Sequence, residues 1–474
     1  MFFQQIFEEK LAQYAYLIGC QASGEAIIID PMRDIDRYQK LADKNDLKIV
    51  AAADTHIHAD YLTGLRELAE KGIKVYASDE GGDDWKYEWL KDSTYNYELL
   101  KEGGLFSIGN IRFTVMHSPG HTPEHIAYLV TDGAAADEPM GLLSGDFVFV
   151  GDVGRPDLLE SAAGQKGVMK SSAEVLYKSL EKFRELPDYL QLWPGHGAGS
   201  ACGKALGAVP ESTVGYEQRF NGSIRAATSQ QEFVDFILKG QPEPPLYFAR
   251  MKRDNRSGPK VLGSMPAPRH ITIEKMIGEV RLNQAVIVDT RDRTSFMKEH
   301  IHGSLLSPMN KQFNTIVGSY VEEDEDIYLI ISDNKVEDAV RDLIRIGLDN
   351  IKGYATPDEL KAFSEAGGKL FKTDTIDFAE VDEYMEQEGT HLLDVRKKSE
   401  FDEGHHPEAQ NIAHTRLLAR LDEIPKDKEV LVHCRSGARA SAASAMLERA
   451  GFQIKYVDDK VEPWLEQHKW SGAN

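Results

Sequence analysis

The sequence predicts three α/β domains in one chain, and three observations lead to this fold class. Its 474 residues correspond to about three domains of typical size, roughly 150 residues each. A proline-rich stretch from Gln241 to Arg269 interrupts any helical or strand period and indicates a linker. Beyond it, Ile287–Arg291 is repeated as Leu392–Arg396 at an offset of about 105 residues, which favours duplicated domains over short solenoid repeats.

Composition excludes several classes of function. The formal charge of -22 disfavours binding to nucleic acid or to anionic lipid. No window reaches the roughly 18 apolar residues of a membrane-spanning helix, and the first residues do not resemble a secretory signal. The three cysteines lie far apart, which is typical of free thiols in a reducing cytoplasm.

The predicted elements alternate between strands and helices. Before the linker, the strand-like runs Ala26–Ile29 and Ile111–Val115 precede a helix-like stretch from Ala173 to Glu185. Each later repeat begins with an apolar strand and contains a second one, Ile327–Ile331 or Val430–His433, followed by a helix-like stretch. The pattern predicts a mixed α/β first domain and two further α/β units.

Four Gly-flanked or strand-end turns in the first domain carry side chains that bind metals. The run from Asp54 to Tyr61, Thr-His-Ile-His-Ala-Asp in its centre, follows a strand-like segment. It is followed by turns that present His121, Asp146 and His196. A single loop histidine is usually a surface residue, but four such turns in this order indicate a metal site.

These turns resemble the metallo-β-lactamase superfamily, whose pattern is HxHxDH followed by separated His, Asp and His ligands. The resemblance covers about residues 1–240 and implies an αββα sandwich with the metal at one edge. The chain has Tyr61 where the pattern ends in histidine. This departure favours a site with one metal ion.

Within the superfamily, the chain looks most like the persulfide dioxygenases. That resemblance implies His56, His121 and Asp146 as ligands of one Fe(II) per chain. Two imidazoles and one carboxylate are typical of non-haem Fe(II) enzymes, with open positions for substrate and oxygen. The same resemblance implies that four further residues lie beside the ligands and orient them, namely His58, Asp60, Tyr61 and His196.

Two further residues are candidates for substrate binding in this domain. Arg155 could anchor a carboxylate or fix the Asp146 loop, and an ordinary structural salt bridge is the alternative. Cys202 follows His196 in a glycine-rich loop and could carry sulfur near the iron. The alternative is an inert buried thiol.

A second chemical motif lies in the last repeat, where Cys434 to Arg439 joins a strand to a helix-like run. Backbone N–H groups and the helix dipole at such a junction lower the pKa of a thiol. Arg435 and Arg439 add positive charge and can bind an oxyanion. Cys434, Arg435 and Arg439 are therefore the candidate catalytic residues, and the loop residues Ser436, Gly437 and Ala438 are candidates for substrate binding.

This loop resembles the rhodanese sulfurtransferases, which implies that Cys434 carries a persulfide sulfur. The loop has one residue fewer than that of the dual-specificity phosphatases, which favours sulfur transfer. The first repeat has Ser332 and acidic residues in place of this loop. The expected domains are 1–240 for the metal domain, 241–261 for the linker, 262–371 for a degenerate rhodanese-like domain and 372–474 for an active rhodanese domain.

Together the resemblances imply a dioxygenase that oxidises a low-molecular-weight thiol persulfide, such as glutathione persulfide, with O2 to sulfite and thiol. Cys434 would interconvert sulfite plus persulfide and thiosulfate. A glyoxalase II-like thioester hydrolase with two zinc ions is one alternative, and a non-enzymatic sulfur carrier is another. The expected partners are small molecules and further copies of the chain in a homo-oligomer.

Overall fold

The computed structural model describes residues 1–161, 167–282 and 285–468. The chain divides into two compact units: Met1–Ser264 with Ile344–Gly347, and Met265–Leu343 with the residues from Leu348 onward. The end of the predicted rhodanese domain, residues 469–474, and residues 162–166 of the first domain lie outside the described part. Within that part, no helix is long and apolar enough to cross a membrane.

The first unit contains two six-stranded sheets. One has the order β1(Phe2–Glu8), β2(Gln13–Cys20), β3(Glu25–Ile29), β4(Lys48–Ala53), β5(Lys74–Ser78), β6(Tyr97–Leu100). The other has the order β12(Ser212–Thr213), β11(Gln191–Pro194), β10(Gly141–Gly145), β9(Ile126–Asp132), β8(Ile111–His117), β7(Leu105–Ile108).

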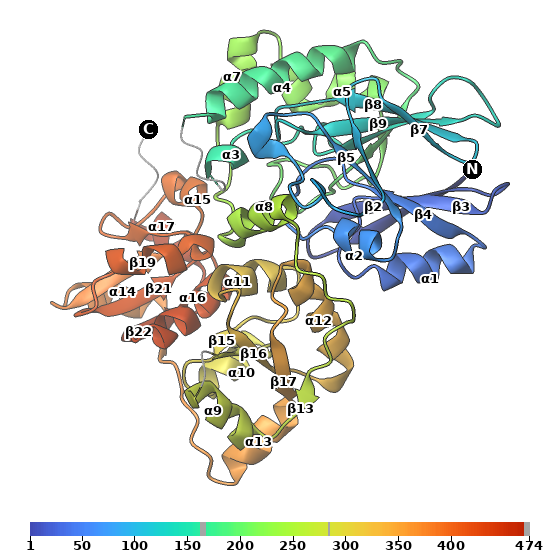
Figure 1. Ribbon diagram of the computed structural model, residues 1–474. Coiled ribbons are helices and arrows are strands. Elements are labelled where there is room, and N and C mark those ends of the chain that lie inside the picture. The colour runs from blue at the N-terminus through green and yellow to red at the C-terminus, as the bar shows by residue number, and fades with distance from the viewer. Residues whose placement is uncertain (162–166, 283–284, 469–474) are drawn as a thin grey trace. The chain divides into compact units, whose positions relative to one another are not determined.

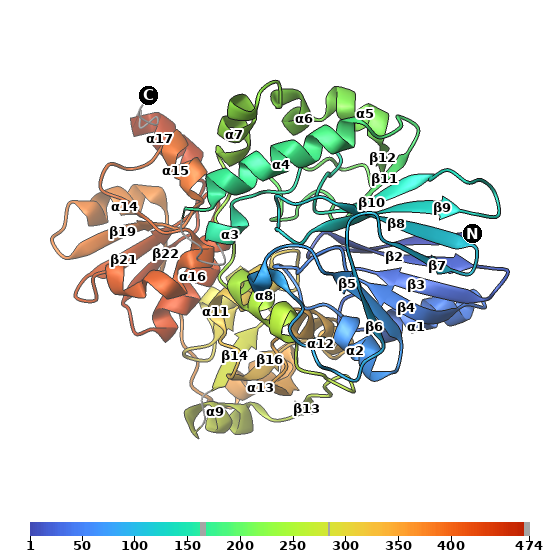
Figure 2. The same ribbon diagram turned by 45° about the horizontal axis from the view of Figure 1, so that its top comes forward.

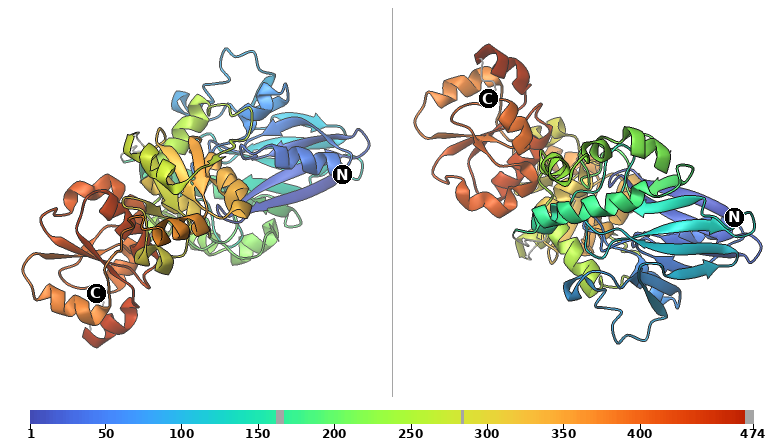
Figure 3. Two further views of the ribbon diagram at one scale, coloured as in Figure 1. Left: turned by 90° about the horizontal axis from the view of Figure 1, so that it is seen from below. Right: turned by 90° about the horizontal axis from the view of Figure 1, so that it is seen from above.

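The helices of this unit are α1(Asp36–Lys44), α2(Leu65–Glu70), α3(Leu158–Ser161), α4(Met169–Arg184), α5(Val214–Phe220), α6(Gly222–Ala226), α7(Gln230–Leu238) and α8(Tyr247–Ser257), with the short 3-10 turn η1(Asp83–Trp85). Figure 2 shows the two sheets facing each other, with α1 outside one and α4 outside the other. In Figure 3, the blue helix α1 faces the viewer in the left view and the green helix α4 faces the viewer in the right view. The αββα sandwich predicted from the sequence is confirmed.

Alternation along the strands produces these layers. In β2, Tyr16 and Ile18 face the core between the sheets, while Ala15 and Leu17 face the core under α1 and α2. A third core joins strands β9, β10 and β11 to α4 and α7. Because successive strand residues point to opposite faces, each sheet has two buried faces and needs a cover on both.

The second unit contains two five-stranded parallel sheets of the same topology (Figure 1). The first has the order β13(Arg269–His270), β17(Ile351–Ala355), β16(Asp326–Ile330), β14(Ala285–Asp289), β15(Leu305–Leu306). The second has the order β18(Thr375–Ile376), β22(Ile454–Val457), β21(Glu429–His433), β19(Thr390–Asp394), β20(Gln410–Asn411). The predicted duplication therefore has a structural counterpart, strand for strand.

The helices of the second unit follow the same plan. They are α9(Ile273–Leu282), α10(Arg293–Lys298), α11(Phe313–Tyr320), α12(Val336–Arg345), α13(Pro357–Glu365), α14(Phe378–Met385), α15(Lys398–Glu403), α16(Ala438–Arg449) and α17(Val461–His468), with the 3-10 turns η2(Asp333–Lys335), η3(His414–Arg416) and η4(Leu418–Glu423). The repeated Asp-x-Arg sequence forms the same brace in both copies: Arg291 binds Asp289 and Arg396 binds Asp394, each through two side-chain nitrogens.

One helix lies inside the segment that the prolines predict as a linker. Between Pro245 and Pro259 the chain forms α8, which belongs to the first unit and buries Tyr247, Phe248 and Met251. The prolines bound the helix and do not interrupt it, which is why a periodicity argument over the whole stretch does not reveal it. The predicted domain boundaries themselves stay predictions.

Candidate metal centre and thiol loop

The metal-binding side chains of the first unit gather at one edge of the sandwich. His56 follows β4, Asp146 follows β10, and His121 lies in the connection between β8 and β9. One ligand atom from each of these three side chains lies within 4.8 Å of the others. All three side chains are buried. The structure therefore brings together the three residues that the resemblance implied as ligands.

The geometry of this group fits a cation. Asp146 Oδ2 lies 3.4 Å from His121 Nε2 and 3.9 Å from His56 Nε2. Neither carboxylate oxygen of Asp146 has a hydrogen-bond partner among the described residues, which is costly for a buried acceptor. Burial lowers the pKa of both histidines, and a neutral imidazole is the form that binds metals. Two neutral imidazoles and a carboxylate without a hydrogen bond form a donor set that suits a divalent metal ion.

Hydrogen bonds orient both imidazoles. His121 Nδ1 donates to the backbone oxygen of Arg155 over 3.0 Å. His56 Nδ1 lies 2.9 Å from Thr55 Oγ1, and the Thr55 hydroxyl donates to Asp30 Oδ2. Such partners fix the ring orientation, so that both Nε2 atoms point toward Asp146.

His58 and Tyr61 turn away from this group. His58 Nε2 lies 3.2 Å from Asp30 Oδ1 and 2.9 Å from the Tyr61 hydroxyl. Burial opposes the charge of His58, but Asp30 outweighs it and raises the pKa of His58 to about 9. In this structure His58 is therefore a charged partner of Asp30, and Tyr61 bonds to it.

A second group of ligand-type atoms adjoins the first. Asp60, His196 and Cys202 also each offer an atom within 4.8 Å of the others. His196 Nε2 lies 3.4 Å from Asp60 Oδ2 and 3.4 Å from Asp146 Oδ1, so Asp146 lies between the two groups. Burial, followed by the charges of Asp60 and Asp146, raises the pKa of Cys202 well above its usual range. The Cys202 thiol thus lies beside the candidate metal centre, in surroundings that disfavour its negative charge.

The guanidinium of Arg155 forms a structural salt bridge, which was the alternative to its two predicted functional roles. Its guanidinium binds both oxygens of Asp157, at 2.8 and 2.6 Å, and also the backbone oxygens of Ala201 and Pro242. Because its backbone oxygen also accepts from His121, Arg155 fixes the loops around the centre. Its guanidinium is held by protein acceptors.

Two important residues of this region were not singled out from the sequence. Asp30, at the end of β3, holds both Thr55 and His58. Its position directly after an apolar strand is the signal that could have revealed it, because β3 and β4 are parallel and end at the same edge. Lys252, on α8, was hidden in the predicted linker.

The thiol loop of the second unit has the predicted strand–loop–helix form. Cys434 follows β21 and is buried, and Gly437 precedes α16 with φ of 85°. A Cβ at Gly437 would lie 2.4 Å from both Asp458 Oδ1 and the Tyr456 hydroxyl oxygen. Glycine is thus required there both by backbone conformation and by space.

Both predicted arginines of this loop carry acidic partners. Arg439 pairs with both oxygens of Glu400 on α15, and the more exposed Arg435 pairs with Glu462 on α17. Neither carboxylate was singled out from the sequence. An oxyanion that binds to these arginines must therefore share them with Glu400 and Glu462.

The degenerate repeat also contributes to the thiol loop. Arg293, at the start of α10, donates through Nη1 to the backbone oxygen of Ser436 over 2.7 Å. Its Nη2 lies 3.0 Å from Asp458 Oδ1. The degenerate first repeat therefore helps to hold the thiol loop of the second repeat.

Family models and known proteins show what this chain is similar to. The metallo-beta-lactamase superfamily model matches residues 9–196, and the rhodanese-like domain model matches residues 377–467. A crystal structure described as a metallo-beta-lactamase from Staphylococcus aureus subsp. aureus COL is 40% identical, with a TM-score of 0.67. The match covers 75% of this chain and 99% of the chain in that crystal structure.

Two curated relatives match the first half. Persulfide dioxygenase ETHE1 of Bos taurus is 29% identical over 248 residues, which is 51% of this chain and 82% of the relative. A hydroxyacylglutathione hydrolase of Francisella tularensis subsp. novicida is 30% identical over 191 residues, which is 40% of this chain and 64% of the relative.

Proposed function

This chain belongs to the metallo-β-lactamase superfamily and carries a rhodanese domain, and from that premise we propose that it oxidises a thiol persulfide and transfers sulfane sulfur. The first unit converts the persulfide, O2 and water into thiol, sulfite and two protons. The second unit moves sulfur between persulfide, sulfite and thiosulfate through Cys434. The group formed by His56, His121 and Asp146 carries this proposal.

The donor set supports iron. A bound Fe(II) supplies a redox-active centre with open positions for sulfur and oxygen, whereas zinc has no accessible redox step. His56, His121 and Asp146 would hold that ion. Thr55 and the Arg155 backbone oxygen orient the two rings, and the buried site excludes bulk water.

The second unit supports the sulfur-transfer step. Cys434 is the only cysteine among the described residues of that unit, and it lies at the N-terminus of α16. Its thiolate would attack the outer sulfur of a persulfide and release the thiol. Sulfite would then take that sulfur from Cys434 to form thiosulfate, with the negative charge near Arg439.

One experiment tests the first unit. Protein purified without air should contain about one iron per chain and consume one O2 for each glutathione persulfide converted. Two zinc ions per chain, thioester cleavage and no O2 uptake would instead establish the hydrolase alternative, in which Asp60, His196 and Cys202 help to bind a second ion. Turnover beyond one equivalent excludes a sulfur carrier.

A further inference from the structure

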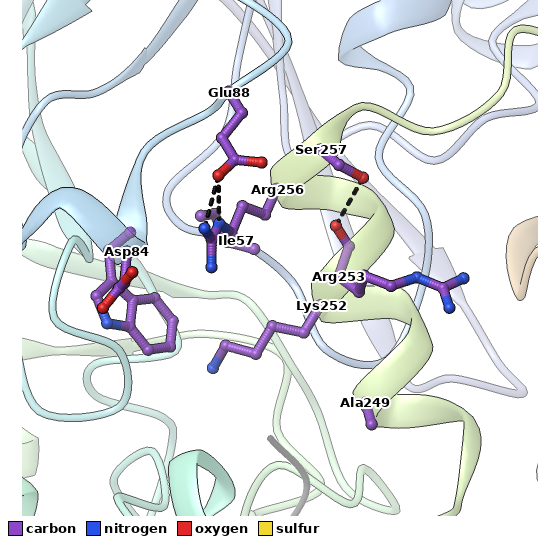
Figure 4. A pocket seen from close by; sticks show the side chains of 9 residues that line it. Ile57, Asp84, Glu88, Ala249, Lys252, Arg253, Arg256 and Ser257 are labelled. Carbon is purple, nitrogen blue, oxygen red and sulfur yellow. Dashed lines mark hydrogen bonds and ion pairs between the residues drawn. The ribbon is translucent and has the colours of Figure 1, made fainter. Parts of the chain in front are cut away.

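Helix α8 lines a cavity in the first unit. The cavity has a volume of about 400 Å³ and is lined by Ile57, Asp84, Trp85 and Glu88 and by the α8 residues Ala249, Lys252, Arg253, Arg256 and Ser257. Figure 4 shows the Lys252 side chain extending away from the axis of α8. Ile57 lies between His56 and His58, so the cavity reaches the loop that carries the candidate metal ligand His56.

Lys252 is the unusual residue of this cavity. It is 6% exposed, and its Nζ has no hydrogen-bond partner in the described ranges. Nζ lies 4.1 Å from the centre of the Trp85 ring, which offers only a weak cation–π contact. A buried ammonium without a hydrogen-bond acceptor is costly even where the charge of a buried carboxylate, here Glu124, partly balances it, so Nζ can take an oxygen of a bound anion as its acceptor.

The other cations of the cavity are already paired. Arg256 binds Glu88 through two nitrogens, and Arg253 binds Asp254. Figure 4 shows the contact between Arg256 and Glu88 as dashed lines, and none reaches Lys252. The buried Glu124 carboxylate acts on the charge of Lys252, but within the part of the chain that the structure describes it accepts no hydrogen bond from Nζ.

Lys252 also lies within electrostatic reach of the candidate metal centre. Burial and His125 lower the pKa of His121 most, and the charge of Lys252 lowers it further. Burial in turn lowers the pKa of Lys252 to about 8, against the opposing effect of Glu124 and Cys202. The cavity and the centre are therefore parts of one electrostatic environment.

We propose that Lys252 binds an anionic oxygen group, a carboxylate or a phosphate, of the thiol whose persulfide is oxidised. This inference rests on the proposed function and narrows its substrate to thiols with a charged tail. Glutathione and bacillithiol carry carboxylates and coenzyme A carries phosphates, whereas an inorganic polysulfide has no such tail. Trp85 would cover the bound group and exclude water from its contact with Nζ.

The test compares Lys252→Met and Lys252→Arg with Lys178→Met, an exposed lysine of α4. Oxygen uptake is measured with the persulfides of glutathione, coenzyme A, bacillithiol and the uncharged 2-mercaptoethanol. We expect Lys252→Met to raise KM about tenfold or more for at least one charged substrate and less than about twofold for the uncharged one. Lys252→Arg should restore part of the loss, and Lys178→Met should behave as wild type.

Equal changes for charged and uncharged persulfides, or no change, would overturn the proposal. The comparison between the three charged persulfides distinguishes carboxylate from phosphate. Iron content is measured for every variant, because a loss of metal would change all substrates alike.

A binding measurement separates this inference from the proposed function. Calorimetry without air measures the binding of the free thiols glutathione, coenzyme A and bacillithiol to the metal-loaded protein. If wild type consumes no O2 but Lys252→Met weakens the binding of one of these thiols, the proposed function fails and the anion site stands. If wild type consumes O2 and Lys252→Met leaves both binding and KM unchanged, the anion site fails alone.

Discussion

At the scale of single residues, Asp146 has the most demanding position in the first unit. Its two oxygens face the His56–His121 pair on one side and His196 on the other, and neither has a hydrogen-bond partner among the described residues. Burial raises the pKa of this carboxyl to about 6. Such an arrangement is costly to maintain without a cation, so the chemistry of the site depends on this side chain.

Asp146→Asn tests that dependence with little change in shape. The amide is neutral and a poor metal ligand, so the variant should lose bound metal and at least about a hundredfold of O2 uptake. Sulfur transfer from thiosulfate should be unchanged, because Cys434 lies in the other unit. Metal analysis and the two activity assays decide this, and a variant that keeps its metal would contradict the assignment.

Cys434→Ser tests whether sulfur transfer and persulfide oxidation are separate activities of the two units. Serine cannot carry a persulfide, so thiosulfate formation should fall below detection while sulfite production from persulfide continues. Sulfite and thiosulfate are measured in the same reaction by chromatography. Loss of both products would show that the two activities are not separate.

At the scale of elements, α10 of the degenerate repeat supports the thiol loop through Arg293. Arg293→Met removes its bonds to Ser436 and Asp458. The loop should then lose its position, with kcat of sulfur transfer reduced about tenfold and KM little changed. Lys298→Met, at an exposed position of the same helix, is the matched control.

A second readout identifies Arg293 as a positioning residue. Cys434 is buried, so a looser loop should make its alkylation by iodoacetamide faster. Lower activity without faster alkylation would indicate a direct contact of Arg293 with substrate.

The ion pair between Glu400 and Arg439 joins α15 to α16. Its contribution to the stability of the protein should depend on pH. Burial opposes the charge of Glu400, but its hydrogen bonds to Arg439 outweigh it and hold the pKa below the ordinary value of 4.5. The stability from a lowered carboxyl pKa is present above the ordinary value and is lost as the pH falls through the lowered one. Because solvent screens this partly exposed pair, Glu400→Gln should cost about 0.5–1 kcal/mol at pH 7.

Denaturant unfolding of wild type and Glu400→Gln at several pH values measures this effect. The difference in the free energy of unfolding should shrink as the pH falls below 4.5, because protonated Glu400 then resembles glutamine. A difference that stays constant down to pH 3.5 would show that the charge of Glu400 is not its source.

At the scale of the whole molecule, each of the two units has cores of its own. Two thermal transitions are therefore expected. Removing the metal with a chelator should lower only the transition of the first unit, by about 5–10 °C, because a tightly bound ligand contributes a few kcal/mol of stability. Calorimetry with and without added Fe(II) measures this, and equal shifts of both transitions would contradict it.

Much of the fold could be predicted because its signals are local. The predicted strands Ala26–Ile29 and Ile111–Val115 are short apolar-rich runs, and they form β3 and part of β8 in the sandwich. The predicted helix Ala173–Glu185 is α4, which begins earlier, at Met169. Helix α8 was missed because proline composition over the whole stretch hid a short amphipathic segment.

For the candidate site, the turns that carry His56, His121, Asp146 and Cys434 could be recognised because ligands and nucleophiles stand beside glycines at strand ends. The side chains that surround or contact these residues could not be recognised from the sequence. Asp30, Glu400 and Lys252 have no motif, since nothing in the residues around them states which distant side chain each will meet.

The sequence by itself determined the order of the domains, the strand and helix periods and the residue types of both chemical motifs, because these depend on neighbours along the chain. Only the tertiary structure decided which way each side chain faces. It directed His58 and Tyr61 toward Asp30, surrounded the Arg155 guanidinium with protein acceptors and left Lys252 without one. The reason is that burial and the pairing of buried charges arise from contacts between segments far apart in the chain, which acquire their energy only when those segments pack together.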